Sequence, residues 1–135
     1  MSPVAAVDGL RILPTPHSVP QVLQRIESMV RARGLTVFAH IDFSGDAQRS
    51  GLTLRPTGLV IFGNPTSGTP LMAATPTVAI DLPLKILAWE DADGANWVAY
   101  NEVEYLRARH AFPAELMKNL SAISVLAAAA AAPDP

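Results

Sequence analysis

The sequence contains no cysteine and few charged residues, and these two absences exclude several classes of function. Without cysteine there is no disulfide, no thiolate zinc site, no cysteine-ligated iron–sulfur cluster and no cysteine nucleophile. Only 16% of the residues are charged, and ten Lys and Arg stand against twelve Asp and Glu without a basic run. This balance argues against a nucleic-acid partner. The lack of cysteine fits a reducing compartment, so we expect a cytoplasmic protein.

The sequence also lacks a long uninterrupted hydrophobic run. Residues 1–13 include Pro3, Gly9 and Arg11, so no apolar core of a signal peptide forms there. The stretch Leu120–Ala132 is apolar but shorter than the roughly 20 residues that span a bilayer. We therefore expect an Ala-rich helix end rather than a membrane segment, and no membrane partner.

Half of the 135 residues are hydrophobic, which is enough for a core without disulfides or structural metals. Neither an internal repeat nor a linker is visible. We expect one domain over residues 1–135, with residues 1–8 and 133–135 as loose ends.

Hydrophobic periodicity predicts alternating strands and helices. Ser18 is the expected N-cap of the first helix, Gln21 completes a capping box, and Gly34 is the expected terminator. Further helices are expected over 46–49, 66–75, 103–110 and from Pro113 towards Pro133. Strands are expected over 9–13, 35–41, 58–63, 82–91 and 95–101. In the strand over 35–41, one face is expected to carry Leu35, Val37, Ala39 and Ile41, and the other Thr36, Phe38 and His40.

The last two strands form the clearest hairpin, since Asp93-Gly94 is a tight-turn signal between them. Trp89 and Trp97 are expected to pack across it. The simplest architecture is an α+β two-layer sandwich, with about five mixed or antiparallel strands and helices on one face. The second face would be partly apolar, with Phe38, Leu87 and Trp89 as candidates. Because such a face usually finds a partner, we expect a homodimer.

Four stretches of the chain resemble the DUF302 family, also called TT1751-like. They are VFAHIDFSGDA at 37–47, GLTLRPTGLVIFGNPTSGTPLM at 51–72, AIDLPLKILAWED at 79–91 and VAYNEVEYL at 98–106. The resemblance implies a small two-layer α/β domain that tends to dimerise, and it implies no settled activity. Many relatives have a histidine where this chain has Phe43, so a mechanism that needs that imidazole would be absent or moved to His40.

Polar side chains at strand ends are the candidate site. His40 and Asp42 share one face of their strand, so they could act as a general base or share a metal ion. They could equally cap a loop or face solvent, and two ligands fall short of a zinc site. Asn64 could bond a ligand or close an Asx turn.

Asp81 and Lys85 lie four residues apart on one face of a regular strand. They could form a simple ion pair, which we favour, or bind a polar ligand together with other side chains at strand ends. The full tentative ligand-binding set is His40, Asp42, Arg55, Asn64, Asp81 and Lys85.

No catalytic signature of the GxSxG, GxGxxG or HExxH type is present, and we expect neither a metal nor a cofactor. Three hypotheses follow. The first is a dimeric small-ligand-binding or accessory protein. The second is an enzyme on a small polar or anionic substrate, with Asp42 or His40 as base and Lys85 or Arg55 holding charge. The third is a structural interaction module. The enzyme requires these groups to converge in one cleft.

Overall fold

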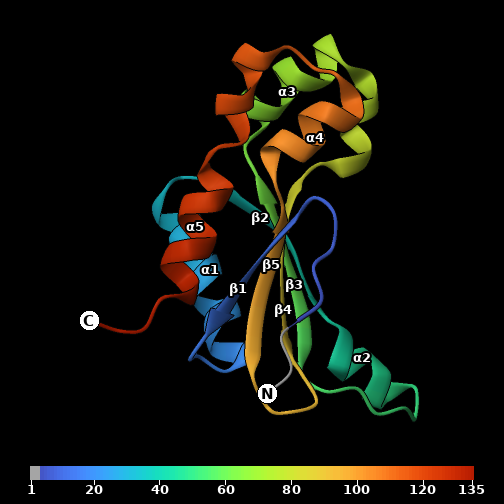
Figure 1. The fold of residues 1–135 in the computed structure, drawn as a ribbon, viewed down its shortest axis with the longest axis vertical. Helices are drawn as coiled ribbons and strands as arrows, with labels where there is room; N and C mark the ends of the chain where they lie inside the picture. Colours follow the sequence, from blue (N-terminus) through green and yellow to red (C-terminus); the bar gives the residue numbers. More distant parts are fainter. Residues whose placement is uncertain (1–3) are drawn as a thin grey trace.

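The computed structural model describes residues 4–135 and is built around a five-stranded sheet (Figure 1). Neighbouring strands are all antiparallel, in the spatial order β1-β5-β4-β3-β2. The strands are β1 (Leu10–Thr15), β2 (Thr36–Asp42), β3 (Thr57–Gly63), β4 (Leu84–Glu90) and β5 (Asn96–Asn101). The α+β class predicted from the sequence is confirmed. Residues 1–3 of the expected loose N-terminal end lie outside the described residues.

Helices cover one face of the sheet and gather at one of its ends. Figure 1 shows α1 and α5 on the same face, α3 and α4 together at one end, and α2 at the other. The helices are α1 (Val19–Ala32), α2 (Phe43–Arg49), α3 (Pro65–Ala74), α4 (Val103–His110) and α5 (Ala122–Ala131). Two 3₁₀ segments, η1 (Pro76–Asp81) and η2 (Ala114–Leu120), complete the helical end.

Helix α1 begins and ends where the sequence indicates. The Gln21 N–H donates to Ser18 Oγ, and the Ser18 N–H donates back to the Gln21 side chain, so the capping box is complete. Gly34 follows the C-cap with a φ of +73°, a backbone conformation that favours glycine. One apolar stripe of α1 and the facing side chains of the central strands form the core. Its fully buried members include Val22, Ile26, Val60, Phe62, Ile86 and Val98.

A β-bulge in β2 changes the predicted faces of that strand. Val37 pairs with Phe62 and Ala39 pairs with Ile61, so Phe38 has no partner in the register. Val37 therefore faces the helices and packs against the core, whereas Ala39 follows Ile61 to the opposite face. The expected single face of alternating apolar residues is wrong, because strict alternation fails across a bulge.

The hairpin between β4 and β5 is confirmed in its turn and register. Trp89 pairs with Trp97, and Gly94 has a φ of +81° in the turn. The Asp91 carboxylate accepts the backbone N–H groups of Asp93 and Ala95, and also the indole N–H of Trp97 at 2.9 Å. One side chain thus fixes both the turn and a cross-strand aromatic pair.

The sheet face turned away from α1 and α5 is mostly apolar and half-buried; we call it the open sheet face. On this side Figure 1 shows α2 and the segment before β1. Its large apolar side chains are Ile12, Leu59, Ile61, Leu87, Trp89 and Trp97. Leu87 and Trp89 lie on it as expected, but Phe38 falls in the bulge. Pro14 lies in β1, an outer strand, which is where a sheet tolerates proline.

The C-terminal helix is divided, contrary to the expectation of one helix from Pro113. Segment η2 ends at Leu120 and α5 begins at Ala122. Among the described residues, Ala114–Ala131 is the one stretch whose length and apolar content would suffice to cross a membrane, and 33% of it is buried in the fold. A helix that packs into a protein core meets the same criteria.

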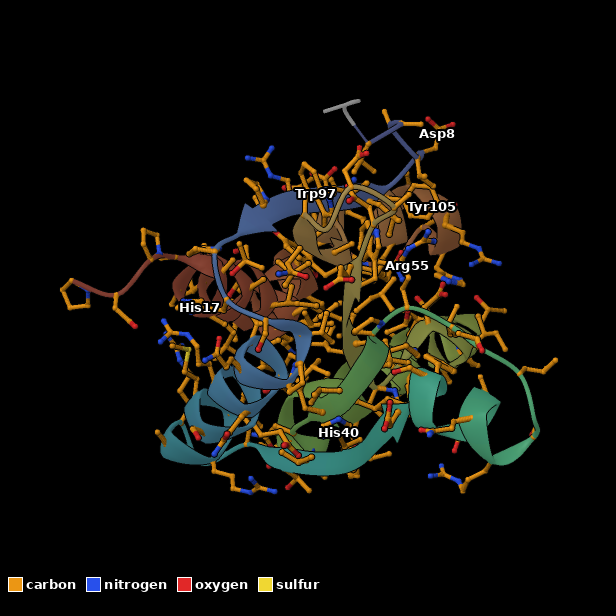
Figure 2. The ribbon with its side chains drawn as sticks, turned by 90° about the horizontal axis from the view of Figure 1, so that it is seen from below. Asp8, His17, His40, Arg55, Trp97 and Tyr105 are labelled. Atoms are coloured by element: carbon orange, nitrogen blue, oxygen red, sulfur yellow. The ribbon has the colours of Figure 1, made fainter. Side chains whose placement is uncertain are left out.

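The last turn of α5 is held by α1 and the segment before it. Arg25 Nε donates to the Ala130 carbonyl at 2.9 Å, and its guanidinium also contacts the Asp134 carboxylate at 2.9 Å. The His17 Nε2 atom lies 2.7 Å from the Ala132 carbonyl oxygen. Figure 2 shows His17 beside this C-terminal segment. Asp134, expected in a loose end, is therefore tied to α1.

Candidate functional site

An apolar cavity of about 440 Å³ lies at the helical end of the sheet. It is bounded by α3, η2, the start of α5 and the adjoining ends of β2, β3 and β4; we call it the α3–α5 cavity. Its volume falls within the usual range of small-molecule sites. Its apolar lining consists of Leu35, Phe38, Met72, Leu82, Leu84, Leu120 and Val125, together with small residues.

Two large apolar side chains of this lining are open to solvent. Phe38 is 50% exposed and Val125 is 52% exposed, although each borders the cavity. The bulge in β2 places Phe38 there, with its ring edge near Gly63. Removing apolar side chains from water lowers the free energy. The position of Phe38 and Val125 at the border of the cavity therefore favours a ligand that covers them.

The polar part of the cavity comes from α3, η2 and the end of α1. Arg33 and Lys118 line it, and so does Asn119, whose side-chain amide donates to the Ser67 carbonyl at 3.0 Å. That bond ties η2 to α3. Asn64 also lines the cavity, but its Oδ1 accepts the Thr66 N–H and caps α3. The turn interpretation of Asn64 is therefore confirmed, and its ligand-binding role stays a prediction.

His40 and Asp42 line a different hollow, a polar groove of about 630 Å³ between α1, β2 and the start of β3. His40 Nδ1 lies 3.3 Å from a Glu27 carboxylate oxygen. Asp42 caps α2, accepting the Gly45 N–H at 3.0 Å and the Ser44 hydroxyl at 2.8 Å. These two hydrogen bonds, the backbone one first, lower the pKa of Asp42 below its ordinary value. Asp42 thus has the capping role that the sequence left open.

Asp81 joins a cluster at the contact between η1 and α4. Its carboxylate accepts from Arg109 at 3.1 Å and lies 2.5 Å from His110 Nε2. On the other side of the imidazole, His110 Nδ1 lies 3.0 Å from the Thr77 hydroxyl. The His110 side chain is only 6% exposed, so the cluster holds α4 onto η1. The predicted partner, Lys85, is not in an ion pair with Asp81.

Lys85 lies on the open sheet face, where its ammonium group donates to the Pro83 carbonyl at 3.0 Å. Burial lowers the pKa of Lys85, and the nearby Asp81 charge partly opposes that effect. The favoured ion pair between Asp81 and Lys85 was wrong, because the Asp81 carboxylate bonds Arg109 and His110, which are distant in sequence.

Arg55 lies in the exposed loop before β3, close enough to Asp91 for its charge to lower the pKa of that carboxyl slightly.

The six predicted residues therefore do not converge. Asp42 pairs with Gly58 at the start of β3, whereas Asn64 follows its end, about 20 Å away at the usual rise per residue. His40 pairs with Val60 on the helix-covered face, and Lys85 pairs with Ile61 on the open sheet face. Figure 2 likewise separates His40, beside β2, from Arg55. Within residues 4–135 no group of three or more potential metal-ligating His, Asp or Glu side chains occurs.

Sequence reasoning missed Arg33, Lys118 and Asn119 at the cavity, and Thr77, Arg109 and His110 around Asp81. None belongs to a recognisable motif. In the sequence, Lys118 and Asn119 merely precede the apolar stretch Leu120–Ala132, and His110 is an isolated histidine. Their roles depend on contacts between segments tens of residues apart, which no local pattern encodes.

The antiparallel sheet with helices on one face defines a small two-layer α+β domain. Within that class, the chain belongs to the family described as "Domain of unknown function DUF302", whose profile matches residues 12–130. This confirms the resemblance found in the sequence. It adds no assigned activity.

Two curated relatives are named "Fluoride-specific ion channel FluC 1", from Brucella suis biovar 1 and Brucella abortus biovar 1. Each is 39% identical to this chain over 110 residues, or 80% of the chain. The chain spans only 43% of the first relative and 41% of the second. More than half of each relative thus lies outside the matched region, and its name describes the whole protein.

A solved structure supports the fold independently of close sequence similarity. The crystal structure of an uncharacterized conserved DUF302 protein from Bacillus stearothermophilus superposes with a TM-score of 0.74 at 16% identity. The match covers 93% of this chain and 97% of that one. At this identity the likeness establishes the fold alone.

Proposed function

We propose that this chain is a non-enzymatic small-ligand-binding domain whose site is the α3–α5 cavity. The observation that carries the proposal is an apolar hollow of about 440 Å³ whose border leaves Phe38 and Val125 half exposed. A ligand with an apolar body would remove both side chains from water. Polar groups at the rim, Asn64 among them, would orient it.

The acid–base alternative has less support. It needs His40 or Asp42 as base and Lys85 or Arg55 as charge-holding group in one cleft. Since His40 and Lys85 lie on opposite faces of the sheet, we do not propose a reaction by these residues.

A blocked cavity tests the binding function. Among the described residues, Met72 Cε, at 3.7 Å, is the one side-chain atom that a Cβ at Gly68 in α3 would meet. Because Gly68 and Met72 both line the cavity, we expect a larger side chain at position 68 to occupy part of it. Gly68→Leu also replaces glycine inside a helix, which favours folding. We expect 1-octanol to raise the melting temperature of the wild type but not of Gly68→Leu, measured by differential scanning calorimetry.

Thr66→Leu is the matched control, because Thr66 is an exposed residue of α3 that does not line the cavity. It should respond to 1-octanol as the wild type does. An equal response of wild type and Gly68→Leu, or no response by either, would show that the cavity is not a binding site.

We also propose an accessory role beside a membrane ion channel, supported by the names of the Brucella relatives, of which this chain matches less than half. Deleting the gene for this chain should lower the NaF concentration that halves growth of its host, while equal NaCl has no effect. Unchanged NaF sensitivity would contradict this role.

A further inference from the structure

We infer that the α3–α5 cavity binds a single-chain aliphatic carboxylate, with its headgroup beside Arg33 and Lys118 and its tail among Phe38, Met72 and Val125. This inference rests on the proposed binding function and names the ligand class. Arg33, the C-cap residue of α1, and Lys118 of η2 both line the cavity. Figure 1 shows α1 and α5 side by side on one face of the sheet.

The charges around the cavity are one-sided. Among residues 4–135, Arg33 and Lys118 are the charged residues that line it, and no Asp or Glu does. The whole chain has the opposite bias, with twelve acidic residues against ten basic ones. A hollow that collects two cations and no carboxylate on an acidic chain creates a local positive potential, which favours an anionic headgroup.

Both cations are free to bind that headgroup. Within residues 4–135, neither Arg33 nor Lys118 forms an ion pair with a carboxylate, whereas Arg25, Arg31 and Arg109 do. The first N–H groups of α3 are not available instead. Thr66 donates to the Asn64 side chain, and Ser67 and Gly68 donate to the Asn64 carbonyl. The side chains of Arg33 and Lys118 therefore supply the attraction, and the helix end does not.

The lining and the volume of the cavity determine which ligand tail fits, in polarity and in length. Phe38, Met72 and Val125 offer an aromatic ring, a flexible thioether chain and a branched alkyl group, none of which bonds a polar tail. If each methylene or headgroup atom occupies about the volume of a water in liquid, roughly 30 Å³, the cavity of about 440 Å³ holds roughly fifteen of them, which corresponds to a chain of about a dozen carbons with its carboxylate oxygens. Octanoate, decanoate and dodecanoate fit, and longer chains would project into solvent.

Isothermal titration calorimetry with octanoate and 1-octanol separates charge from tail, because the two probes share one alkyl chain. We expect octanoate to bind wild type at least about threefold more tightly, and raising NaCl from 50 to 500 mM to remove that advantage. Arg33→Gln and Lys118→Gln should each weaken octanoate about threefold. Both should leave 1-octanol unchanged. Arg31→Gln is the matched control, since Arg31 lies on the same helix but does not line the cavity.

The outcomes distinguish the two proposals. Equal affinity for both probes, with binding lost in Gly68→Leu, overturns the carboxylate inference and leaves the binding function standing. Failure of both probes to bind overturns both. Loss of 1-octanol binding in Arg33→Gln or Lys118→Gln, with unchanged circular dichroism, shows that these side chains shape the cavity rather than hold an anion, and it also overturns the inference.

Discussion

Gly9 and Gly94 have nearly the same backbone conformation but different surroundings. Their φ angles are +80° and +81°, which strain any residue with a Cβ. A Cβ at Gly9 would lie 2.3 Å from the Tyr105 ring, whereas one at Gly94 would have no described residue within 4 Å apart from its chain neighbours. Figure 2 shows Asp8, the preceding residue, near Tyr105.

We therefore expect Gly94→Ala to lower the free energy of unfolding by about 1–2 kcal/mol, the cost of the left-handed backbone alone. Gly9→Ala should cost about 1–3 kcal/mol more, because the Tyr105 ring must move. Urea unfolding of both variants measures the difference. Equal losses would mean that the ring moves aside freely.

The Asp91 carboxylate makes the stability of the fold depend on pH. The hydrogen bond from Trp97, followed by those from Ala95 and Asp93, lowers its pKa below the usual 3.8. A carboxyl whose pKa is lower in the folded state stabilises the fold above its unfolded pKa. That contribution is lost as pH falls below about 3.8 and through the lower folded value.

We expect Asp91→Asn to lower the melting temperature at pH 7 and to differ less from wild type at pH 3. The variant cannot accept the Trp97 N–H at the substituted atom but keeps an oxygen for the turn. Asp93→Asn is the control, because its side chain makes no hydrogen bond within residues 4–135. If the difference in melting temperature between Asp91→Asn and wild type were the same at pH 7 and pH 3, the ionised Asp91 carboxylate would not be the source of the stabilisation.

At the scale of the element, Arg25 caps the C-terminal turn of α5. The last carbonyls of a helix have no partner within it. Arg25 donates to the carbonyls of Ala129 and Ala130, at 3.2 and 2.9 Å. Hydrogen bonds from a charged donor contribute about 1.5–3 kcal/mol each, less where the donor is partly exposed.

Arg25→Ala should therefore destabilise the protein by about 1–2 kcal/mol and speed amide hydrogen exchange in the last turn of α5. Exchange in the first turn, at the cavity, should not change. Arg31→Ala removes an exposed ion pair from the same helix and should have little effect. Unaltered exchange throughout α5 would show that Arg25 does not cap it.

The elements were readable from the sequence because their determinants are local. The capping box of α1 and the Asp-Gly turn act within a few residues, and so they were found. The bulge in β2 was not, because strict alternation carries no sign of an extra residue. The 3₁₀ geometry of η2 was missed for a similar reason, since its apolar spacing also suits an α-helix.

The candidate site was predicted poorly, because which side chains come together depends on contacts between segments that are far apart in the sequence. Of the six residues, Asn64 alone lines the α3–α5 cavity. Asp42 and Asn64 looked equivalent as polar residues at strand ends, yet antiparallel pairing places them at opposite ends of β3. Arg33 and Lys118, 85 positions apart in the sequence, meet only through the packing of α1, η2 and α5.

At the scale of the whole molecule, we propose a homodimer formed through the open sheet face. Leu87 lies near its centre, since it pairs with Leu59 on one side and with Ala99 on the other. Burying Leu59, Leu87 and Trp89 against a second copy would remove a contiguous apolar surface from water.

Leu87→Glu should shift the protein from dimer to monomer in size-exclusion chromatography with light scattering at tens of micromolar. Leu52→Glu, a matched change at a 67% exposed loop position, should leave the dimer intact. A monomeric wild type under these conditions would contradict the proposal.

The outer strands limit how copies of this molecule can join. An unprotected edge strand can pair with a strand of another chain and extend the sheet, which leads to aggregation and fibres. Here β1 carries Pro14, which has no N–H to offer, and β2 is deformed at Phe38. With both margins unsuited to growth, the proposed association through the open sheet face would stop at two copies, and the protein should stay dispersed even when concentrated.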